Sequence, residues 1–341
     1  MSKLFRALEI REEDGQYRRH LVQRSLEQLP DGEILIRVRY SSLNYKDALS
    51  ASGNRGVTRR YPHTPGIDAA GVVEASSVAA WKPGDEVLVC DYDLGMNTAG
   101  GFGQYIRVPE GWVMARPSSL SPSDCMMLGT AGFTAALCVH RLLAAGLPPE
   151  AGPILVTGAS GGVGSVAVAL LAQLGHQVTA ASGKPEAADL LLELGANAII
   201  DREQVIGARE KMLARERWAG VVDTVGGEML AGAIKSCRYG GTVTCCGNAA
   251  SHRLELSVYP FILRAVSLLG IDAAECPMAL RQQVWGLLAG PWRINSLGKL
   301  AQTVDLDGLE QEIERMLAGR HHGRTVVDLG SADTEESNHG A

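Results

Sequence analysis

The glycine-rich turn Gly158-Ala-Ser160-Gly161-Gly162-Val163-Gly164 constrains the fold of this chain more than any other segment. The apolar run 154–157 before it predicts a strand, and the apolar stretch 165–174 after it predicts a helix. A strand that enters a helix through glycines lets backbone N–H groups and the positive helix end approach a pyrophosphate. The alternative is a glycine-rich turn that binds nothing. The repeated strands and helices that follow favour a dinucleotide site.

Strand and helix patterns alternate beyond this turn. We expect strands at 176–181, 197–200, 220–223 and 241–246, with a helix that opens at Lys184-Pro185 and ends at Leu194-Gly195. Such alternation predicts parallel βαβ units and therefore an α/β domain with a doubly wound sheet. We place this domain at residues 126–268.

The first third of the chain has a different pattern. Short strands are predicted at 33–40, 71–74 and 85–90, and Lys82-Pro-Gly-Asp85 is a turn signal between two of them. Many short strands with Gly/Pro turns predict a compact, barrel-like β domain. The chain after Gly270 returns to a mixed pattern, so we assign residues 1–125 and 269–330 to this second domain. Residues 331–341 are polar and acidic, and we expect them to form a disordered tail.

The segment after the second predicted strand bears on the choice of cofactor. NAD sites place an acid there, about 20 residues after the glycine turn, to bind the ribose 2′-hydroxyl. This chain has Ser182-Gly183-Lys184 instead, and Arg202 follows the third predicted strand. A hydroxyl and two cations suit a 2′-phosphate, although both cations could belong to a solvated surface. We therefore predict NADPH as the cofactor.

Charge and cysteine content exclude several other classes of protein. The net charge of −6 over 341 residues argues against nucleic-acid binding. No run of eighteen or more apolar residues occurs, and the first twenty residues lack the pattern of a signal peptide, so we expect neither a membrane span nor export. The seven cysteines are scattered without a C-x-x-C pair, which is typical of reduced thiols in the cytoplasm.

A metal site is not expected. Catalytic zinc needs three protein ligands, but Cys90, Cys125, His20 and His63 are isolated in the first third of the sequence, and Asp68 alone cannot form a site. Without a Lewis acid, an alcohol or simple ketone is difficult to polarise for hydride transfer. Substrates activated by conjugation, such as enones, enoyl thioesters or quinones, fit the sequence better.

Several motifs together give a specific resemblance. They are Ser41-Ser-Leu-Asn-Tyr-Lys-Asp47, Pro65-Gly-Ile-Asp-Ala-Ala-Gly71, Gly129-Thr-Ala-Gly-Phe-Thr-Ala135, the glycine turn and Tyr259-Pro-Phe-Ile-Leu-Arg264. Over residues 4–329 the chain resembles the acrylyl-CoA reductase branch of the quinone-oxidoreductase-like medium-chain dehydrogenases/reductases. The resemblance implies a Rossmann domain inserted into a GroES-like catalytic domain. It also implies NADPH-dependent reduction of acryloyl-CoA to propanoyl-CoA.

The same resemblance assigns cofactor-binding residues. Tyr45 matches a tyrosine beside the nicotinamide, and the pyrophosphate and 2′-phosphate segments match as described above. Residues near the nicotinamide end are carried over less directly. The full predicted set is Tyr45, Ser160, Gly161, Gly162, Val163, Ser182, Gly183, Lys184, Arg202, Cys246, Asn248, Ile262 and Ile271.

Catalysis would require a proton at the substrate α-carbon. Tyr45 is the predicted donor or orienting group, and Asn44 lies beside it. The alternative is that Tyr45 only packs against the cofactor ring and solvent supplies the proton. Asp47 is expected to form a salt bridge, with orientation of Lys46 or of the backbone as the other role.

A CoA ester would carry phosphates far from its reacting carbon, and their binding could position it. The candidate cations are Arg55, Arg59, Arg60, Arg264 and Arg324, each of which could equally be a surface cation. The resemblance also implies a homodimer, joined through a strand near residues 267–271. A quinone or free-enone reductase and a non-catalytic NADPH-binding protein remain as alternative functions.

Overall fold

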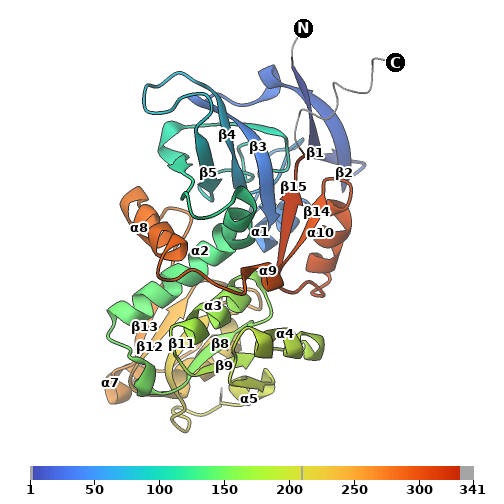
Figure 1. Ribbon diagram of the computed structural model, residues 1–341. Helices are drawn as coiled ribbons and strands as arrows, with labels where there is room; N and C mark the ends of the chain where they lie inside the picture. The colour runs from blue at the N-terminus through green and yellow to red at the C-terminus, as the bar shows by residue number, and fades with distance from the viewer. Residues whose placement is uncertain (1–2, 209, 331–341) are drawn as a thin grey trace. The chain divides into compact units, whose positions relative to one another are not determined.

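A computed structural model describes residues 3–208 and 210–330 of the chain. The chain forms two units (Figure 1). Unit 1 contains the chain up to Thr130 and again from Ala301, and unit 2 contains Ala131–Leu300. The predicted tail at 331–341 lies outside the described residues.

Unit 2 is built on a parallel sheet of six strands among its described residues. The strand order is β10-β9-β8-β11-β12-β13, and every neighbouring pair is parallel. The sequence order reverses between β8 and β11, which is the doubly wound Rossmann arrangement. The predicted fold class is therefore confirmed. The strands are β8 (Ile154–Thr157), β9 (Val178–Ala181), β10 (Ala198–Ile200), β11 (Trp218–Asp223), β12 (Cys237–Cys245) and β13 (Ser267–Gly270).

Helices connect these strands and bury both faces of the sheet. Every residue of β8, β9 and β11 is buried, as expected for parallel strands covered on two sides. The helices between the strands are α3 (Gly162–Gln173), α4 (Ala188–Glu193), α5 (Glu203–Ile206), α6 (Gly227–Lys235) and α7 (Tyr259–Arg264), and α8 (Met278–Ala289) and α9 (Leu297–Leu300) follow the last strand.

Helix α2 (Pro122–Ala144) begins in unit 1 and continues into unit 2. No membrane span was expected from the sequence, but the described residues contain one helix, α2, with the length and apolar composition to cross a membrane. However, 72% of its most apolar window is buried inside the protein, as in a core helix. The helix is also interrupted at Gly129, whose backbone has φ 52° and ψ −156°.

Unit 1 contains a seven-stranded sheet and a two-stranded hairpin among its described residues. The larger sheet has the order β14-β15-β3-β4-β5-β7, with β6 also paired to β3. Its strands are β3 (Ile34–Leu43), β4 (Asp68–Ser76), β5 (Glu86–Cys90), β6 (Tyr105–Val108), β7 (Met114–Ala115), β14 (Ala301–Asp305) and β15 (Arg324–Asp328), and the hairpin is β1 (Leu4–Glu13) with β2 (Gln16–Ser25).

Two helices of unit 1 bury small and branched apolar side chains against this sheet. Helix α1 (Tyr45–Ser50) contributes Ala48, and α10 (Leu309–Leu317) contributes Leu309 and Ile313 to one core with Leu43 of β3. The return of the chain after unit 2 supplies β14, α10 and β15 (Figure 1). Both ends of the sequence thus build unit 1, and this is the GroES-like domain expected from the sequence.

The carboxyl-terminal boundary of the Rossmann unit lies further along the chain than expected. The expected Rossmann segment was 126–268, whereas unit 2 runs from Ala131 to Leu300. Residues 269–300 group with unit 2 because α8 packs on the second part of α2. The rings of Trp285 and Phe133 stack with centroids 6.4 Å apart, and the Arg281 guanidinium lies 4.8 Å from the Phe133 centroid.

Candidate functional site

The predicted cofactor residues of unit 2 gather at one edge of its sheet. Residues 158–164 follow β8, 182–184 follow β9, Arg202 follows β10, and 246–248 follow β12. Ile271 follows β13, and its N–H donates to the Cys245 carbonyl oxygen at 3.0 Å. All these strands are parallel, so their carboxyl ends lie on the same side. Ligands of open parallel sheets bind at this edge, where the strand order reverses.

The glycine turn has the tight geometry that its sequence predicts. Gly158 has φ 58°, and a Cβ atom there would lie 2.3 Å from Thr224 Oγ1. Gly161 is the N-cap residue of α3 and has no side chain to occupy the helix end. Backbone N–H groups at this end can therefore bind an anion. The side-chain bond from Thr157 Oγ1 to Asp223 Oδ1, 2.6 Å, joins β8 to β11 at the point where the order reverses.

The segment after β9 contacts two polar groups, the hydroxyl of Ser182 and the guanidinium of Arg202. Ser182 is buried, and its Oγ donates to Ser160 Oγ at 3.2 Å and accepts from the Lys184 N–H at 3.1 Å. A Cβ atom at Gly183 would lie 2.4 Å from Nε and 2.7 Å from Cζ of Arg202. Glycine is therefore required for the guanidinium to lie against this backbone. The turn after β9 and the cation after β10 form one cluster, although their residues are distant in sequence.

The two cations of this cluster affect each other. Burial lowers the pKa of Lys184, the charge of Arg202 lowers it further, and the charge of Glu186 opposes both effects. A phosphate bound here would offset the repulsion between ammonium and guanidinium. The donor set thus consists of backbone N–H groups, a buried hydroxyl and two cations. These residues fit the pyrophosphate and 2′-phosphate of NADPH.

Cys246 and Asn248 lie at the end of β12, and their predicted role stays a prediction. A hydrogen bond with the Cys138 thiol and burial hold the pKa of Cys246 well above its usual range, so the side chain is an uncharged thiol. The Asn248 side chain is exposed. Ile262 lies on α7 rather than at a strand end, and 67% of it is exposed. The predicted role of Ile262 near the nicotinamide stays a prediction.

Tyr45, the predicted nicotinamide neighbour, belongs to unit 1. It is the first residue of α1, and 51% of it is exposed. The preceding Asn44 is extended, with φ −120° and ψ 161°. Its N–H donates to Asp47 Oδ2 at 2.8 Å, so a carboxylate in the first turn holds the helix start.

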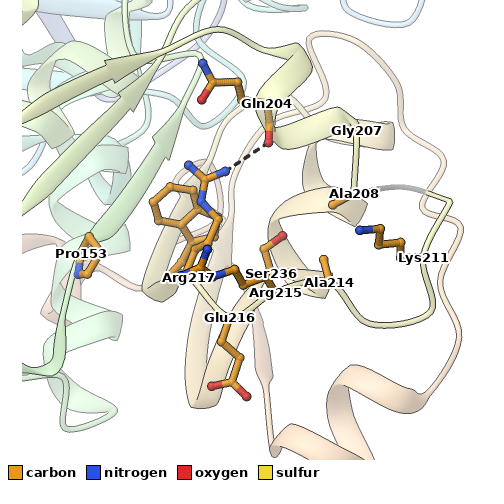
Figure 2. Close-up of a pocket in the computed structure, with 11 residues that line it drawn as sticks. Pro153, Gln204, Gly207, Ala208, Lys211, Ala214, Arg215, Glu216, Arg217 and Ser236 are labelled. Atoms are coloured by element: carbon orange, nitrogen blue, oxygen red, sulfur yellow. Dashed lines mark hydrogen bonds between the residues drawn. The ribbon is translucent and has the colours of Figure 1, made fainter.

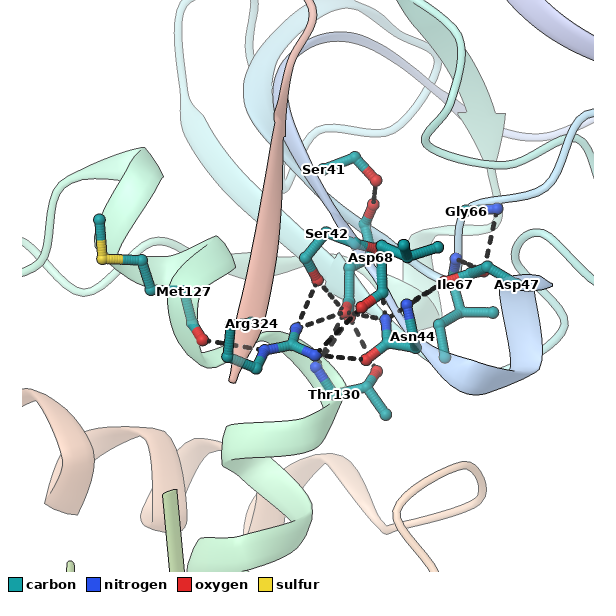
Figure 3. A network of polar contacts seen from close by, with 11 residues as sticks. Ser41, Ser42, Asn44, Asp47, Gly66, Ile67, Asp68, Met127, Thr130 and Arg324 are labelled. Atoms are coloured by element: carbon teal, nitrogen blue, oxygen red, sulfur yellow. Dashed lines mark hydrogen bonds and ion pairs between the residues drawn. The ribbon is translucent and has the colours of Figure 1, made fainter. Parts of the chain in front are cut away.

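The structure shows the surroundings of Asn44, whose predicted catalytic role stays a prediction. Its side chain is buried and lies in a polar network (Figure 3). The Asn44 Nδ2 group donates to Asp68 Oδ2 at 2.8 Å, and Oδ1 accepts from Arg324 Nη1 at 3.0 Å. Because both ends of the amide are bonded to protein groups, Asn44 organises the start of α1.

Asp68 is the centre of this network, although no role was predicted for it from the sequence. Its carboxylate accepts bonds from Ser42 Oγ at 2.6 Å and from Thr130, at 2.9 Å from the N–H and 2.7 Å from Oγ1. The Arg324 guanidinium is 3.9 Å away. The sequence signal for this network was the acid in Ile67-Asp68-Ala-Ala, at the start of an apolar strand. A charge in such a place is buried and therefore needs hydrogen-bonding or charged partners.

Asp47 does not form the salt bridge that was expected. It is fully buried, and its Oδ1 accepts the N–H groups of Gly66 at 3.1 Å and Ile67 at 2.9 Å. Lys46 instead pairs with Asp91 at 3.4 Å. Burial, with the charge of Asp68, raises the pKa of Asp47 to about 7. The alternative role, orientation of the backbone, is the one that the structure contains.

The predicted CoA-binding cations separate into two groups. Arg55 donates to Glu12 Oε2 and to the Arg59 carbonyl oxygen, each at 2.6 Å, and its guanidinium lies over the rings of Tyr17 and Tyr61. Arg59 and Arg60 are exposed. Of the cations in this loop, Arg59 and Arg60 are the better candidates for an external phosphate.

The other two candidates are wrong as phosphate ligands. Arg264 donates to the carbonyl oxygens of Lys235, Cys237 and Ala214 at 2.7–3.2 Å. It therefore stabilises backbone at the amino end of β12. Arg324 is 2% exposed and donates to the Met127 and Leu43 carbonyl oxygens, to Asn44 and to Ser42. Both guanidinium groups are occupied by protein acceptors.

Unit 2 also has a hollow of about 640 Å³ away from the predicted cofactor residues (Figure 2). Pro153 precedes β8, Trp218 begins β11, and Ser236 precedes β12, so these lining residues mark the amino ends of the strands. The Arg217 guanidinium lies 4.3 Å from the Trp218 ring and donates to the Gln204 carbonyl oxygen at 3.3 Å. This hollow is at the sheet edge opposite the glycine turn and is not the dinucleotide site.

Over residues 3–208 and 210–330, no group of three or more His, Cys, Asp or Glu side chains could hold a metal ion. All seven cysteines fall within the described part of the chain, and none forms a disulfide.

Comparison with known proteins gives the family. Residues 30–118 match the alcohol dehydrogenase GroES-like domain, and residues 162–289 match the family described as zinc-binding dehydrogenase. Acrylyl-CoA reductase AcuI of Ruegeria pomeroyi is 44% identical over 323 residues, which are 94% of this chain and 97% of the relative. YhfP of Bacillus subtilis, provisionally named a quinone oxidoreductase, is 42% identical over 330 residues, 96% of this chain and 100% of the relative.

Solved structures agree with this result. The yhdH oxidoreductase of Salmonella enterica in complex with NADP is 40% identical, covers 95% of this chain and 99% of its own, and superposes with a TM-score of 0.92. Bacillus subtilis yhfP with NAD bound has the same TM-score of 0.92, with 96% of this chain and 100% of its own covered. The chain therefore belongs, with the acrylyl-CoA reductases, to the quinone-oxidoreductase-like family of medium-chain dehydrogenases/reductases.

Proposed function

We propose that this chain is an NADPH-dependent oxidoreductase that reduces the activated double bond of acryloyl-CoA to propanoyl-CoA. The observation that carries the substrate is the 44% identity to acrylyl-CoA reductase AcuI over almost the whole of both chains. The cluster of Ser182, Lys184 and Arg202 supports NADPH over NADH. A quinone as substrate is the second candidate, because YhfP is almost as similar and carries a quinone oxidoreductase name.

Residues of this chain would bind and orient the reactants. Ser160–Val163 would bind the pyrophosphate through backbone N–H groups, and Ser182, Lys184 and Arg202 would bind the 2′-phosphate. Bound NADPH supplies a hydride, and the acryloyl group takes it at its β-carbon and a proton at its α-carbon. Tyr45, exposed at the start of α1, would donate or orient this proton, or would pack against the nicotinamide while solvent supplies it.

Oxidation of NADPH, followed by its loss of absorbance, tests the substrate directly. Acryloyl-CoA, crotonyl-CoA, free acrylate and a quinone are compared side by side. We expect the highest kcat/KM with acryloyl-CoA. Tight NADPH binding without turnover of any CoA ester would refute the proposal, and turnover of the quinone alone would support the second candidate.

Substitution of the exposed loop arginines separates the two substrates. The double change Arg59→Ala and Arg60→Ala is expected to raise KM for acryloyl-CoA about 10-fold, since each exposed cation contributes up to about 1 kcal/mol. KM for the quinone should stay unchanged, because it has no phosphate. Arg55→Ala is the control, because Arg55 is already paired with Glu12. An equal rise of both KM values would contradict a CoA-phosphate role.

The partner and location follow from the same assignment. A homodimer through β13 is supported by its place at the edge of the sheet and by exposed apolar side chains on α7, where 57% of Leu263 is exposed. We expect Leu263→Glu to shift the sedimentation coefficient from dimer to monomer. A monomeric unaltered protein would exclude this assembly.

A cytoplasmic location is supported by the seven cysteines, none of which forms a disulfide.

A further inference from the structure

The orientation of Tyr45 depends on how α1 begins. A helix of six residues has little stability of its own, so its place is set by contacts at its two ends. At the far end, Ala48 and Ala51 are buried, and the hydroxyl groups of Ser50 and Thr58 are 2.6 Å apart. At the start, Asn44 is bound by Asp47, Asp68 and Arg324. Tyr45 follows directly after this fixed point.

Asp68 is also held by residues outside α1. Thr130 donates to both carboxylate oxygens, and Ser42 donates to Oδ2. A Cβ atom at Gly129 would lie 2.5 Å from Asp68 Oδ2 and 2.9 Å from Arg324 Nη2, so the break in α2 makes room for this pair. The Asp68 carboxylate is therefore a rigid anchor for the Asn44 amide (Figure 3).

We propose that Asp68 is a positioning residue for the reaction, acting through Asn44 on the orientation of Tyr45. This inference rests on the proposed function, in which Tyr45 is beside the nicotinamide. If the helix started one residue later, Tyr45 would no longer belong to its first turn. One residue of an α-helix corresponds to a rotation of about 100° around the axis and a rise of about 1.5 Å, so the Tyr45 side chain would move by an amount of this order. Misplacement on this scale lowers turnover by up to about 100-fold.

The buried charges are not needed to hold α1 on the protein. Its apolar contacts already bury Ala48 completely, and buried ion pairs often contribute little net stability relative to apolar groups. The hydrogen bonds of Asn44 with Asp47, Asp68 and Arg324 fix the orientation of the backbone where α1 begins. A purely structural role would therefore lower stability, whereas a positioning role would lower kcat through Tyr45.

A double-mutant cycle between Asp68→Asn and Tyr45→Ala tests this inference. Asp68→Asn replaces the charged acceptor of the Asn44 amide with a neutral amide, which keeps one acceptor oxygen and turns the other into a donor. We expect kcat to fall about 10- to 100-fold, with the NADPH dissociation constant within about twofold of the unaltered protein. The double variant should have the kcat of Tyr45→Ala alone. Asn44→Ala removes the side chain that connects Asp68 to the start of α1, and it should lower kcat in the same way. This variant replaces Asp68→Asn in the cycle if Asp68→Asn does not fold.

Ser50→Ala is the matched control, because it removes a buried hydrogen bond from the other end of the same helix. It should lower the melting temperature and leave kcat unchanged. The inference is overturned if Tyr45→Ala keeps full turnover, if the losses in the cycle multiply, or if Ser50→Ala lowers kcat as much as Asn44→Ala.

A measurement without substrate separates this inference from the proposed function. The fluorine resonance of 3-fluorotyrosine at position 45, assigned by its loss in Tyr45→Ala, should shift or broaden in Asn44→Ala and not in Ser50→Ala. If no substrate is turned over, the proposed function fails while this shift still supports the positioning of Tyr45. An unchanged resonance in Asn44→Ala refutes the positioning, whatever the substrate.

Discussion

Replacing Ser182 with aspartate is expected to raise the NADPH dissociation constant about 100-fold and to strengthen NADH binding. Ser182 is the first residue after β9, the place where NAD-binding sheets carry an acid for the ribose 2′-hydroxyl. A carboxylate about 4–5 Å from a phosphate near a protein surface opposes binding by roughly 3 kcal/mol. That free energy corresponds to about a 100-fold change in the dissociation constant.

The local structure should accept this change. Ser182 Oγ already accepts the Lys184 N–H and lies 3.2 Å from Ser160 Oγ, and a carboxylate can accept both groups. Fluorescence titration of NADPH and NADH gives both dissociation constants. Ser182→Asn is the control with similar shape and no charge, and it should weaken NADPH binding much less. If Ser182→Asp binds NADPH like the unaltered protein, the 2′-phosphate does not lie at residues 182–184.

The dinucleotide-binding half of the fold was predictable because its signals are local. The strand at 154–157, the turn at 158–164 and the helix that follows agree with the structure within a few residues. The segment at 182–184 was predicted because NAD sites carry an acid about 20 residues after the glycine turn, and this chain has none there. The contact between Gly183 and Arg202 adds the geometry that the spacing could not give.

The β1–β2 hairpin was not predicted, although its turn was visible. Asp14-Gly15 separates two strands of ten residues each, and both turn residues have positive φ, 52° and 75°. Such an Asp-Gly pair is a strong signal for a two-residue hairpin turn. Charged residues between the apolar ones obscured the pattern of β1, which buries Phe5 and Ala7 on one face and Leu8 and Ile10 on the other.

The polar network of unit 1 could not be derived from spacing. Arg324 Nη2 donates to Ser42 Oγ across 282 residues of sequence, and no local pattern connects β15 to β3. Charge alone suggested that Arg324 and Arg264 were available to a phosphate. Their partners are backbone oxygens and buried side chains, which become neighbours only when strands from distant parts of the chain pair.

Arg324→Gln is expected to lower the free energy of unfolding by about 3–5 kcal/mol, because it leaves the fully buried Asp68 carboxylate without its cation. The Leu43 and Met127 carbonyl oxygens also lose a charged donor. Chemical denaturation followed by circular dichroism measures the loss. Arg264→Gln is the control, since Arg264 also binds backbone oxygens but its carboxylate partner, Glu216, is 47% exposed. We expect a loss of about 1–2 kcal/mol there.

The loss in Arg324→Gln should depend on pH through Asp47. Burial and the charge of Asp68 raise the pKa of Asp47 to about 7, above its unfolded value near 4. The Asp47 carboxyl group therefore holds its proton more tightly in the folded state than in the unfolded state. The contribution of this proton to the free energy of unfolding is lost as pH rises through about 7. The positive charge of Arg324 is one of the groups near Asp47, so its removal should raise the Asp47 pKa further. The variant should be more strongly destabilised at pH 8 than at pH 5.5, and an equal loss at both values would show that Asp47 and Arg324 are not coupled.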